Sequence, residues 1–167
     1  MKKDDLLKYI VAPYNIVSAS IAIFYMWPGF WNPDPNLELI AFVLRIVVFF
    51  GFIFLLLTNL SFYLRNRDYY NFSLKYNFWA QVIQSTAIRV LSFGFNIGAG
   101  TKIIVYLGFR ENISLAFSFK AWNYALVFMN KIDDSLLVGF GFNIVSIVLA
   151  IFFYKLLRAE KINKQPV

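Results

Sequence analysis

The side chains best suited to chemistry in this chain are two cations and a row of polar groups in its third long apolar stretch. Arg89 and Lys102 lie inside that stretch, where a charge costs free energy unless a partner compensates it. Gln81, Gln84 and Ser85 precede them at helical spacing and share one face. We predict that these five residues form a polar and ionic region within the membrane.

This polar row has two interpretations. Its amides can hydrogen-bond between packed helices, or they can line a polar pathway or binding cleft. Depending on where the third stretch enters the membrane, either Arg89 or Lys102 is the buried cation. Asp133 or Asp134 could neutralise Lys102. Otherwise the partner is a lipid phosphate, a bound anion or a carboxylate on another subunit.

The composition excludes several kinds of chemistry. The chain has no cysteine and no histidine, so it offers no thiolate or imidazole ligands to zinc, copper, haem or iron–sulfur clusters. No carboxylate lies deep in an apolar stretch, which argues against a proton relay. Ser92 and Lys102 have the residue types of a catalytic dyad, but ten helical residues separate them by about 15 Å. We therefore expect no catalytic residue, no metal and no cofactor.

The pentapeptide Phe-Gly-Phe-Asn-Ile occurs twice, at residues 93–97 and 140–144. In each copy a glycine permits close approach of two helices, and an asparagine can hydrogen-bond across the contact. Chance similarity is a competing explanation in a chain rich in Phe, Gly and Asn. We predict that the two asparagines meet where two helices pack, and the predicted packing residues are Gly94, Asn96, Gly98, Gly139, Gly141 and Asn143.

Four apolar stretches are long enough to hold these residues in a bilayer, because about 20 apolar residues cross its core. They cover residues 9–27, 37–64, 79–107 and 136–154. Residues 112–130, interrupted by Lys120, are predicted to form an interfacial or re-entrant helix between spans three and four. The alternative is a fifth span, which is less favoured because it would place the basic C-terminal tail on the opposite side of the membrane. The sequence thus predicts an all-α integral membrane protein, a bundle of four transmembrane helices that forms a single domain over residues 1–167.

Basic residues predict the orientation of the four spans. Lysine and arginine are concentrated before span one, between spans two and three, and after span four, which lie on the same side of the membrane in this arrangement. Because such an excess marks the cytoplasmic side, both termini are predicted to be cytoplasmic. Side chains near the ends of the spans are expected to anchor them at the interfaces; these are Arg45, Trp27, Trp31 and Trp79.

Composition favours the same location. Hydrophobic residues make up 60% of the chain and charged residues 15%, whereas soluble domains have about 45–50% and about 25%. The formal charge of +7 comes largely from residues that flank apolar stretches, so nucleic acid is not an expected partner. Frequent Phe, Ile, Asn, Lys and Tyr are typical of an AT-rich genome. We expect a multi-pass protein of a bacterial inner (plasma) membrane, or alternatively of the mitochondrial inner membrane.

Three functions are compatible with this sequence. The first is a non-enzymatic accessory or structural subunit of a larger membrane complex, whose partners are the lipid bilayer and other membrane subunits or further copies of the chain. The second is a homo-oligomeric channel or effector pore, in which the polar row from Gln81 to Arg89 lines an anion-tolerant path. The third and weakest is an enzyme that acts on lipid headgroups through Arg110, Lys120 and Lys131. The missing redox and acid–base groups favour the first.

Overall fold

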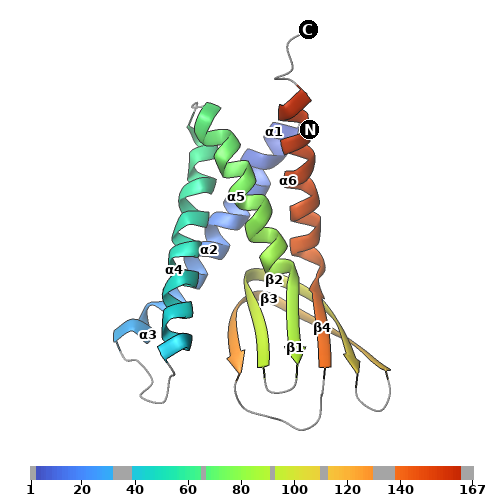
Figure 1. Ribbon diagram of the computed structural model, residues 1–167. Helices are drawn as coiled ribbons and strands as arrows, with labels where there is room; N and C mark the ends of the chain where they lie inside the picture. The colour runs from blue at the N-terminus through green and yellow to red at the C-terminus, as the bar shows by residue number, and fades with distance from the viewer. Residues whose placement is uncertain are drawn as a thin grey trace.

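Helices form the first half of the chain and its last part (Figure 1). The structure, a computed structural model, describes residues 3–31, 39–64, 67–90, 93–109, 113–129 and 138–162. Its long helices are α2 (Ala12–Met26), α4 (Leu39–Leu60), α5 (Arg67–Ser85) and α6 (Ile144–Ile162). Short helical segments extend them: α1 (Lys3–Leu6), a π-helical turn (Leu7–Val11), α3 (Pro28–Trp31) and a 3-10 turn (Ser61–Tyr63).

The local sequence accounts for the first two long helices. Pro13 lies inside the continuous helical segment Lys3–Trp31, directly after the π-helical turn. Because Pro13 has no N–H to donate to the preceding turn, a local departure from regular α-helix is expected there. α4 is an almost continuous run of Leu, Ile, Val and Phe. Arg45 on α4 donates a hydrogen bond to the carbonyl oxygen of Gly29 at 3.2 Å, which ties α3 to α4.

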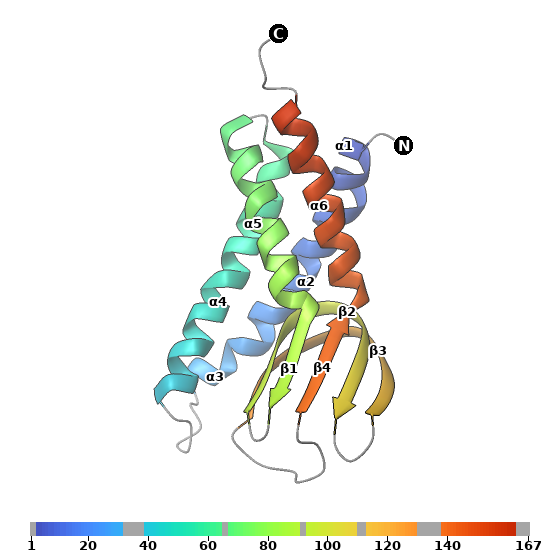
Figure 2. The same cartoon turned by 45° about the vertical axis from the view of Figure 1, so that its right-hand side comes forward.

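Four strands follow α5 and form one antiparallel sheet (Figure 2). They are β1 (Thr86–Val90), β2 (Phe93–Phe109), β3 (Ile113–Met129) and β4 (Val138–Asn143), arranged in the order β1-β4-β2-β3. β3 pairs with β2 along almost its whole length. β1 pairs with the start of β2, β4 pairs with the end of β2, and β1 and β4 pair with each other.

The long β2–β3 hairpin must bend to make these pairings. Its two halves reach down on either side of β1 and β4, and the bend faces the helices (Figures 1 and 2). The register of β2 and β3 shifts between Gly100 and Lys102, and Gly100 has a φ of 96°. A side chain rarely adopts this left-handed backbone conformation, so a glycine at this position permits the bend.

The predicted all-α fold of four transmembrane helices is wrong. The structure contains a sheet, and in its described part only two helical segments are long and apolar enough to cross a membrane, Lys3–Trp31 and Phe42–Tyr63. They fall on the first two predicted spans. The third predicted span is helical only to Ser85, the predicted interfacial helix is β3, and the fourth begins with β4. A helical bundle and a multi-pass location are therefore not supported.

Periodicity explains why the described residues after Ser85 form the strands β1 to β4. Along β2, Lys102, Ile104 and Tyr106 face one side, and Ile103 and Val105 face the other. This alternation has a period of two, and β-branched residues favour strands. Four glycines within β2 also disfavour a helix. The mean apolarity of residues 79–107 predicted a membrane span, but the alternation and the glycines of β2 favour a strand.

Two apolar clusters hold the layers together. The first joins the start of the chain to α5 and α6, through Leu7, Val11, Phe62, Leu74, Phe153 and Leu156. The second joins α2, α4 and β2, through Ala22, Met26, Phe49, Phe52, Leu55 and Ala99. On α2, α4 and α5, the buried residues that lie between these clusters in sequence are polar.

Candidate functional site

An amide cluster, formed by Asn15, Asn59, Asn77 and Gln81, lies between α2, α4 and α5. The Nδ2 atom of Asn15 donates to the Oδ1 atoms of Asn59 and Asn77, each at 3.2 Å. Asn59 Nδ2 donates to Asn77 Oδ1 at 2.7 Å, and Gln81 Nε2 donates to Asn15 Oδ1 at 3.2 Å. All four residues are at most 3% exposed. Because these buried amides satisfy one another, the cluster specifies how the three helices meet.

Hydroxyl groups extend this cluster toward the start of α5. Asn77 Nδ2 donates to the Oγ1 atom of Thr58 at 3.2 Å and to the carbonyl oxygen of Ser73 at 2.9 Å. The hydroxyls of Ser61 and Ser73 hydrogen-bond to each other. A polar seam therefore runs between the helices, from Ser61 to the sheet end of α5.

Lys102 lies at the other end of this seam, where the bend of β2 meets the helices. It is 2% exposed, and its Nζ atom has no hydrogen-bond partner among the described residues. A Cβ atom added to Gly98 would lie 3.1 Å from Lys102 Cε and 3.3 Å from Lys102 Nζ. The side chain therefore occupies space that the glycine leaves open.

The electrostatic environment of Lys102 disfavours its charge. Burial, followed by the positive charge of Lys120, lowers the pKa of Lys102 from 10.5 to about 8. Lys120 is the cross-strand neighbour of Lys102 on β3 and is itself exposed. An anion brought beside Lys102 would reverse this effect, because an opposite charge favours the protonated amine.

The bend of β2 also contacts α2. The Tyr14 hydroxyl accepts a hydrogen bond from the backbone N–H of Thr101 at 2.9 Å. A Cβ atom on Gly100 would lie 2.5 Å from Ser18 Oγ and 2.6 Å from the Tyr14 oxygen. The strand backbone thus approaches α2 more closely than a side chain would permit.

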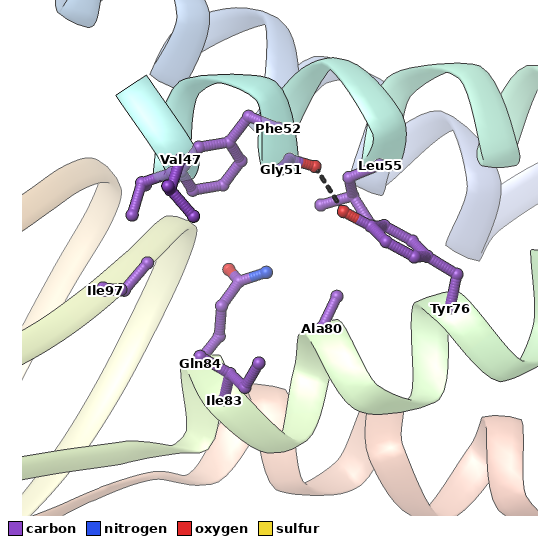
Figure 3. Close-up of a pocket in the computed structure, with 10 residues that line it drawn as sticks. Val47, Gly51, Phe52, Leu55, Tyr76, Ala80, Ile83, Gln84 and Ile97 are labelled. Carbon is purple, nitrogen blue, oxygen red and sulfur yellow. Dashed lines mark hydrogen bonds between the residues drawn. The ribbon is translucent and has the colours of Figure 1, made fainter. Parts of the chain in front are cut away.

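A cavity of about 210 Å³ lies between α4, α5 and β2 (Figure 3). Its lining is mainly apolar, and the Gln84 amide points into it. The other polar side chain on its wall, Tyr76, donates its hydroxyl to the carbonyl oxygen of Gly51 at 2.7 Å. Gln84 Oε1 accepts the backbone N–H of Ala99 at 3.2 Å. The apolar residues of the lining are Val47, Val48, Phe52, Leu55, Ala80, Ile83 and Ile97.

One face of the sheet is apolar and uncovered. On β3 the exposed fractions are 58% for Leu115, 72% for Phe117 and 68% for Phe119. We call this surface the apolar sheet face; strand alternation and cross-strand pairing assign to it Ile103, Val105, Leu107, Phe109, Leu115, Phe117, Phe119, Phe140 and Phe142. β3 is also an edge strand, because β2 is the only described strand that pairs with it.

The predicted polar residues lie in different environments in the structure. Gln81 belongs to the amide cluster, Gln84 lies beside the cavity, and Ser85 donates its hydroxyl to the carbonyl oxygen of Val82. Lys102 is buried. Arg89 lies on β1, opposite Gly94 and Gly139, but its side chain lies outside the described residues, as do Asp133 and Asp134.

The predicted packing residues lie on strands rather than helices. Gly94, Asn96 and Gly98 are on β2, whereas Gly139, Gly141 and Asn143 are on β4. Asn143 Nδ2 hydrogen-bonds to Ser146 Oγ at 2.9 Å. Close approach does occur at one of these glycines: a Cβ atom on Gly141 would lie 2.8 Å from the Tyr106 ring and 3.1 Å from Ala87 Cβ.

The predicted anchors lie on the surface or at a helix contact. Trp27, Trp31 and Trp79 are 52%, 70% and 61% exposed, and the first two rings meet edge to face at 5.7 Å. Arg45 is partly buried by its bond to Gly29. Their anchoring role stays a prediction.

Sequence reasoning missed Asn15, Asn59 and Asn77. A signal was present on α5, because Ser73, Asn77 and Gln81 recur every four residues and therefore lie on one face. The predicted third span begins at residue 79, so residues 73 and 77 were assigned to the connection before it. For this reason the polar face of α5 was predicted only from Gln81 onward. The partners on α2 and α4 are single asparagines in apolar runs, and only the tertiary contacts identify them.

The described residues contain no group of three or more His, Cys, Asp or Glu side chains that could hold a metal ion. Comparison with protein-family models, curated proteins and solved structures gives no match for this chain.

Proposed function

We propose that the protein is a non-enzymatic accessory subunit of a membrane complex, which inserts into the bilayer through α2 and α4 and binds its partner through β3. The observation that carries the proposal is the combination of an unpaired edge with an uncovered apolar face on β3. The membrane location and the subunit role have separate support and separate tests.

Support for insertion comes from the distribution of polarity in the helices. Their buried contacts include the amide cluster, while large apolar side chains point outward. On α4, Val47, Phe50 and Leu57 are 60%, 57% and 54% exposed. Water disfavours this arrangement, whereas lipid hydrocarbon favours it, because polar groups then pair inside and apolar groups face the chains. Lys3–Trp31 and Phe42–Tyr63 have the necessary length and apolarity.

Support for a protein partner comes from the sheet. Hydrocarbon cannot cover the outer edge of β3, because unpaired backbone N–H and C=O groups are too costly there. Water cannot cover its apolar face favourably, and a long apolar edge promotes aggregation. An extended segment of another protein satisfies both requirements, since it pairs with the backbone and packs apolar side chains on the apolar sheet face.

The polar side chains support binding or assembly rather than catalysis or conduction. Gln81 and Gln84 are 3% and 7% exposed and hydrogen-bond within the chain. They are thus engaged inside one subunit, whereas the pore hypothesis needs them at a boundary between subunits. Of the three cations considered for a headgroup enzyme, only Lys120 lies within the described residues, and it is exposed.

Purification in a mild detergent, with identification of bound proteins by mass spectrometry, tests the subunit role. We expect a partner in fixed stoichiometry. Phe117→Lys and Phe119→Lys should each reduce its recovery about tenfold or more, because a charge would be buried in the contact. Leu64→Lys is the matched control, since Leu64 is 62% exposed and follows the 3-10 turn after α4. This end of α4 is the one away from the sheet (Figure 1).

Recovery of the chain with no other protein would contradict the subunit role. The chain could instead be recovered as an oligomer of two or more copies that the Phe117→Lys substitution dissociates. That result would favour self-association, by pairing of the β3 edges of two copies, over a different partner protein. Unchanged partner recovery in both phenylalanine variants would show that β3 is not the contact.

A further inference from the structure

Neither the proposed docking at β3 nor the proposed membrane insertion explains the buried charge of Lys102 or the cavity beside Gln84. Lys102 is a cation that is 2% exposed and has no hydrogen-bond partner in the described part of the chain. Burial of an unpaired ammonium group costs several kcal/mol, so an arrangement that retains it suggests a ligand of opposite charge.

Gln84 connects Lys102 to the cavity. Its Oε1 atom lies 3.7 Å from the position of a Cβ atom on Gly98, and Lys102 Nζ lies 3.3 Å from the same point. The Gln84 amide also points into the cavity (Figure 3). One polar side chain therefore borders both the buried ammonium group and the apolar space between α4 and α5.

The cavity has the character of a site for a hydrocarbon chain. Val47 and Ile83 on its wall are 60% and 48% exposed, so it opens on the apolar outer surface of α4 and α5. Its volume is about 210 Å³. Apolar lining with few polar groups at one end is typical of sites for small apolar or amphiphilic ligands.

We propose that the cavity binds an acyl chain of an anionic lipid and that the lipid headgroup contacts the Lys102 ammonium group. Gln84 lies between the two parts of the ligand and can donate a hydrogen bond through Nε2 to a headgroup or ester oxygen. Gly98 leaves room for the Lys102 side chain itself, which holds the ammonium group near Gln84. Charge complementarity selects an anionic headgroup, because a zwitterionic one would bring a second positive charge beside the Lys102 ammonium group.

This site is separate from the β3 contact and depends on the proposed membrane location only for its supply of lipid. The test therefore uses purified, delipidated full-length protein in detergent. Phosphatidylglycerol and phosphatidylcholine with identical acyl chains are titrated, and bound lipid is counted by native mass spectrometry. Inorganic phosphate is titrated in parallel to distinguish a lipid from a small anion.

We expect phosphatidylglycerol to bind about tenfold more tightly than phosphatidylcholine, because both headgroups carry a phosphate but only choline adds a positive charge that Lys102 repels. Lys102→Met should remove this preference, and it should fold because it replaces a buried charge by an apolar chain. Lys120→Met, the exposed neighbour, should keep the preference. Ala80→Phe, which fills the cavity, should weaken binding of both lipids.

Equal affinity of the two lipids, or a preference unchanged by Lys102→Met, would overturn the headgroup contact. Binding of both lipids unaffected by Ala80→Phe would overturn the chain site. If inorganic phosphate displaces phosphatidylglycerol at equal concentration, the site binds a small anion and the lipid assignment is wrong. None of these results depends on a partner at β3, so they are distinguishable from failure of the proposed function.

Discussion

The ammonium group of Lys102 loses its hydration in the folded protein, and no described residue replaces it. The neutral amine is therefore favoured more than in the unfolded chain, which lowers the pKa of Lys102 from 10.5 to about 8. The amides of Asn15, Asn59 and Asn77 show the opposite case, because each has buried partners. At the residue scale, the buried amides of the described residues pair with one another, whereas the ammonium group of Lys102 has no described partner.

The pKa of Lys102 predicts how stability depends on pH. Between pH 8 and 10.5 the unfolded chain binds more protons than the folded chain, so the free energy of unfolding should rise as pH rises. Tyr70, whose pKa is raised from 10.0 to about 12 by burial and by Asp4 and Glu160, has the opposite effect above pH 10. The rise should therefore be measured below pH 10, by denaturation of delipidated protein in detergent.

Two variants test whether Lys102 causes the predicted rise in the free energy of unfolding with pH. Lys102→Met should abolish it, because no titrating group remains at the site. Lys120→Met should make it smaller, since loss of the neighbouring charge moves the pKa of Lys102 back toward its ordinary value. Identical slopes for the wild type and Lys102→Met would assign the rise to another group. Anionic lipid should also reduce the rise, because a bound anion stabilises the protonated amine.

At the element scale, the bend of the β2–β3 hairpin joins the two layers. The backbone at Gly100 has a φ of 96° and contacts Ser18 and Tyr14 of α2. Lys102 follows directly after the register shift, so the bend also places its side chain against the helices. A straight hairpin could not pair with both β1 and β4 on the same edge of β2.

Gly100→Ala should destabilise the fold by about 2–4 kcal/mol, from the left-handed conformation and from the contact of Cβ with the two hydroxyl oxygens. Gly51→Ala is the control, because its Cβ would meet only the Tyr76 hydroxyl, at 3.8 Å, and alanine favours the helix. Thermal denaturation of the two variants measures the difference. Equal melting temperatures would show that the bend does not depend on Gly100.

At the scale of the whole molecule, the helices and the sheet carry apolar side chains on their outer surfaces and polar side chains inside. In the sheet, Lys102 faces inward, while Phe117 and Phe119 face outward. In the helices, Asn77 faces inward and Phe50 faces outward.

The substitution Phe50→Lys distinguishes lipid from water around α4. Phe50 is 57% exposed near the middle of the helix. If lipid surrounds it, the charge should cost about 2.5–3.5 kcal/mol and reduce insertion. If water surrounds it, the change should stay within about 0.5 kcal/mol. Resistance of the protein to alkaline extraction from membranes measures insertion, and Leu64→Lys at the end of the helix should behave as the wild type.

Part of this arrangement was predictable from the sequence. The first two spans correspond to α2 and α4, because long apolar runs need no distant partner to form helices. The sequence indicated Arg89 or Lys102 as a buried cation; Lys102 is buried, and the side chain of Arg89 lies outside the described residues. The sheet was not predicted, because the inward and outward faces of β2 are both largely uncharged and the segment has the mean apolarity of a span.

By itself, the sequence determined which residues are apolar, which chemistry is missing and where two long helices lie. These properties are local, because they depend on composition and on runs of neighbouring residues. The tertiary structure decided that β1 to β4 form a sheet, that Asn15, Asn59 and Asn77 meet, and that Lys102 lies near Gln84 with no partner among the described residues. Each of these depends on contacts between segments far apart in the chain, which strand pairing and helix packing fix only when the whole chain folds.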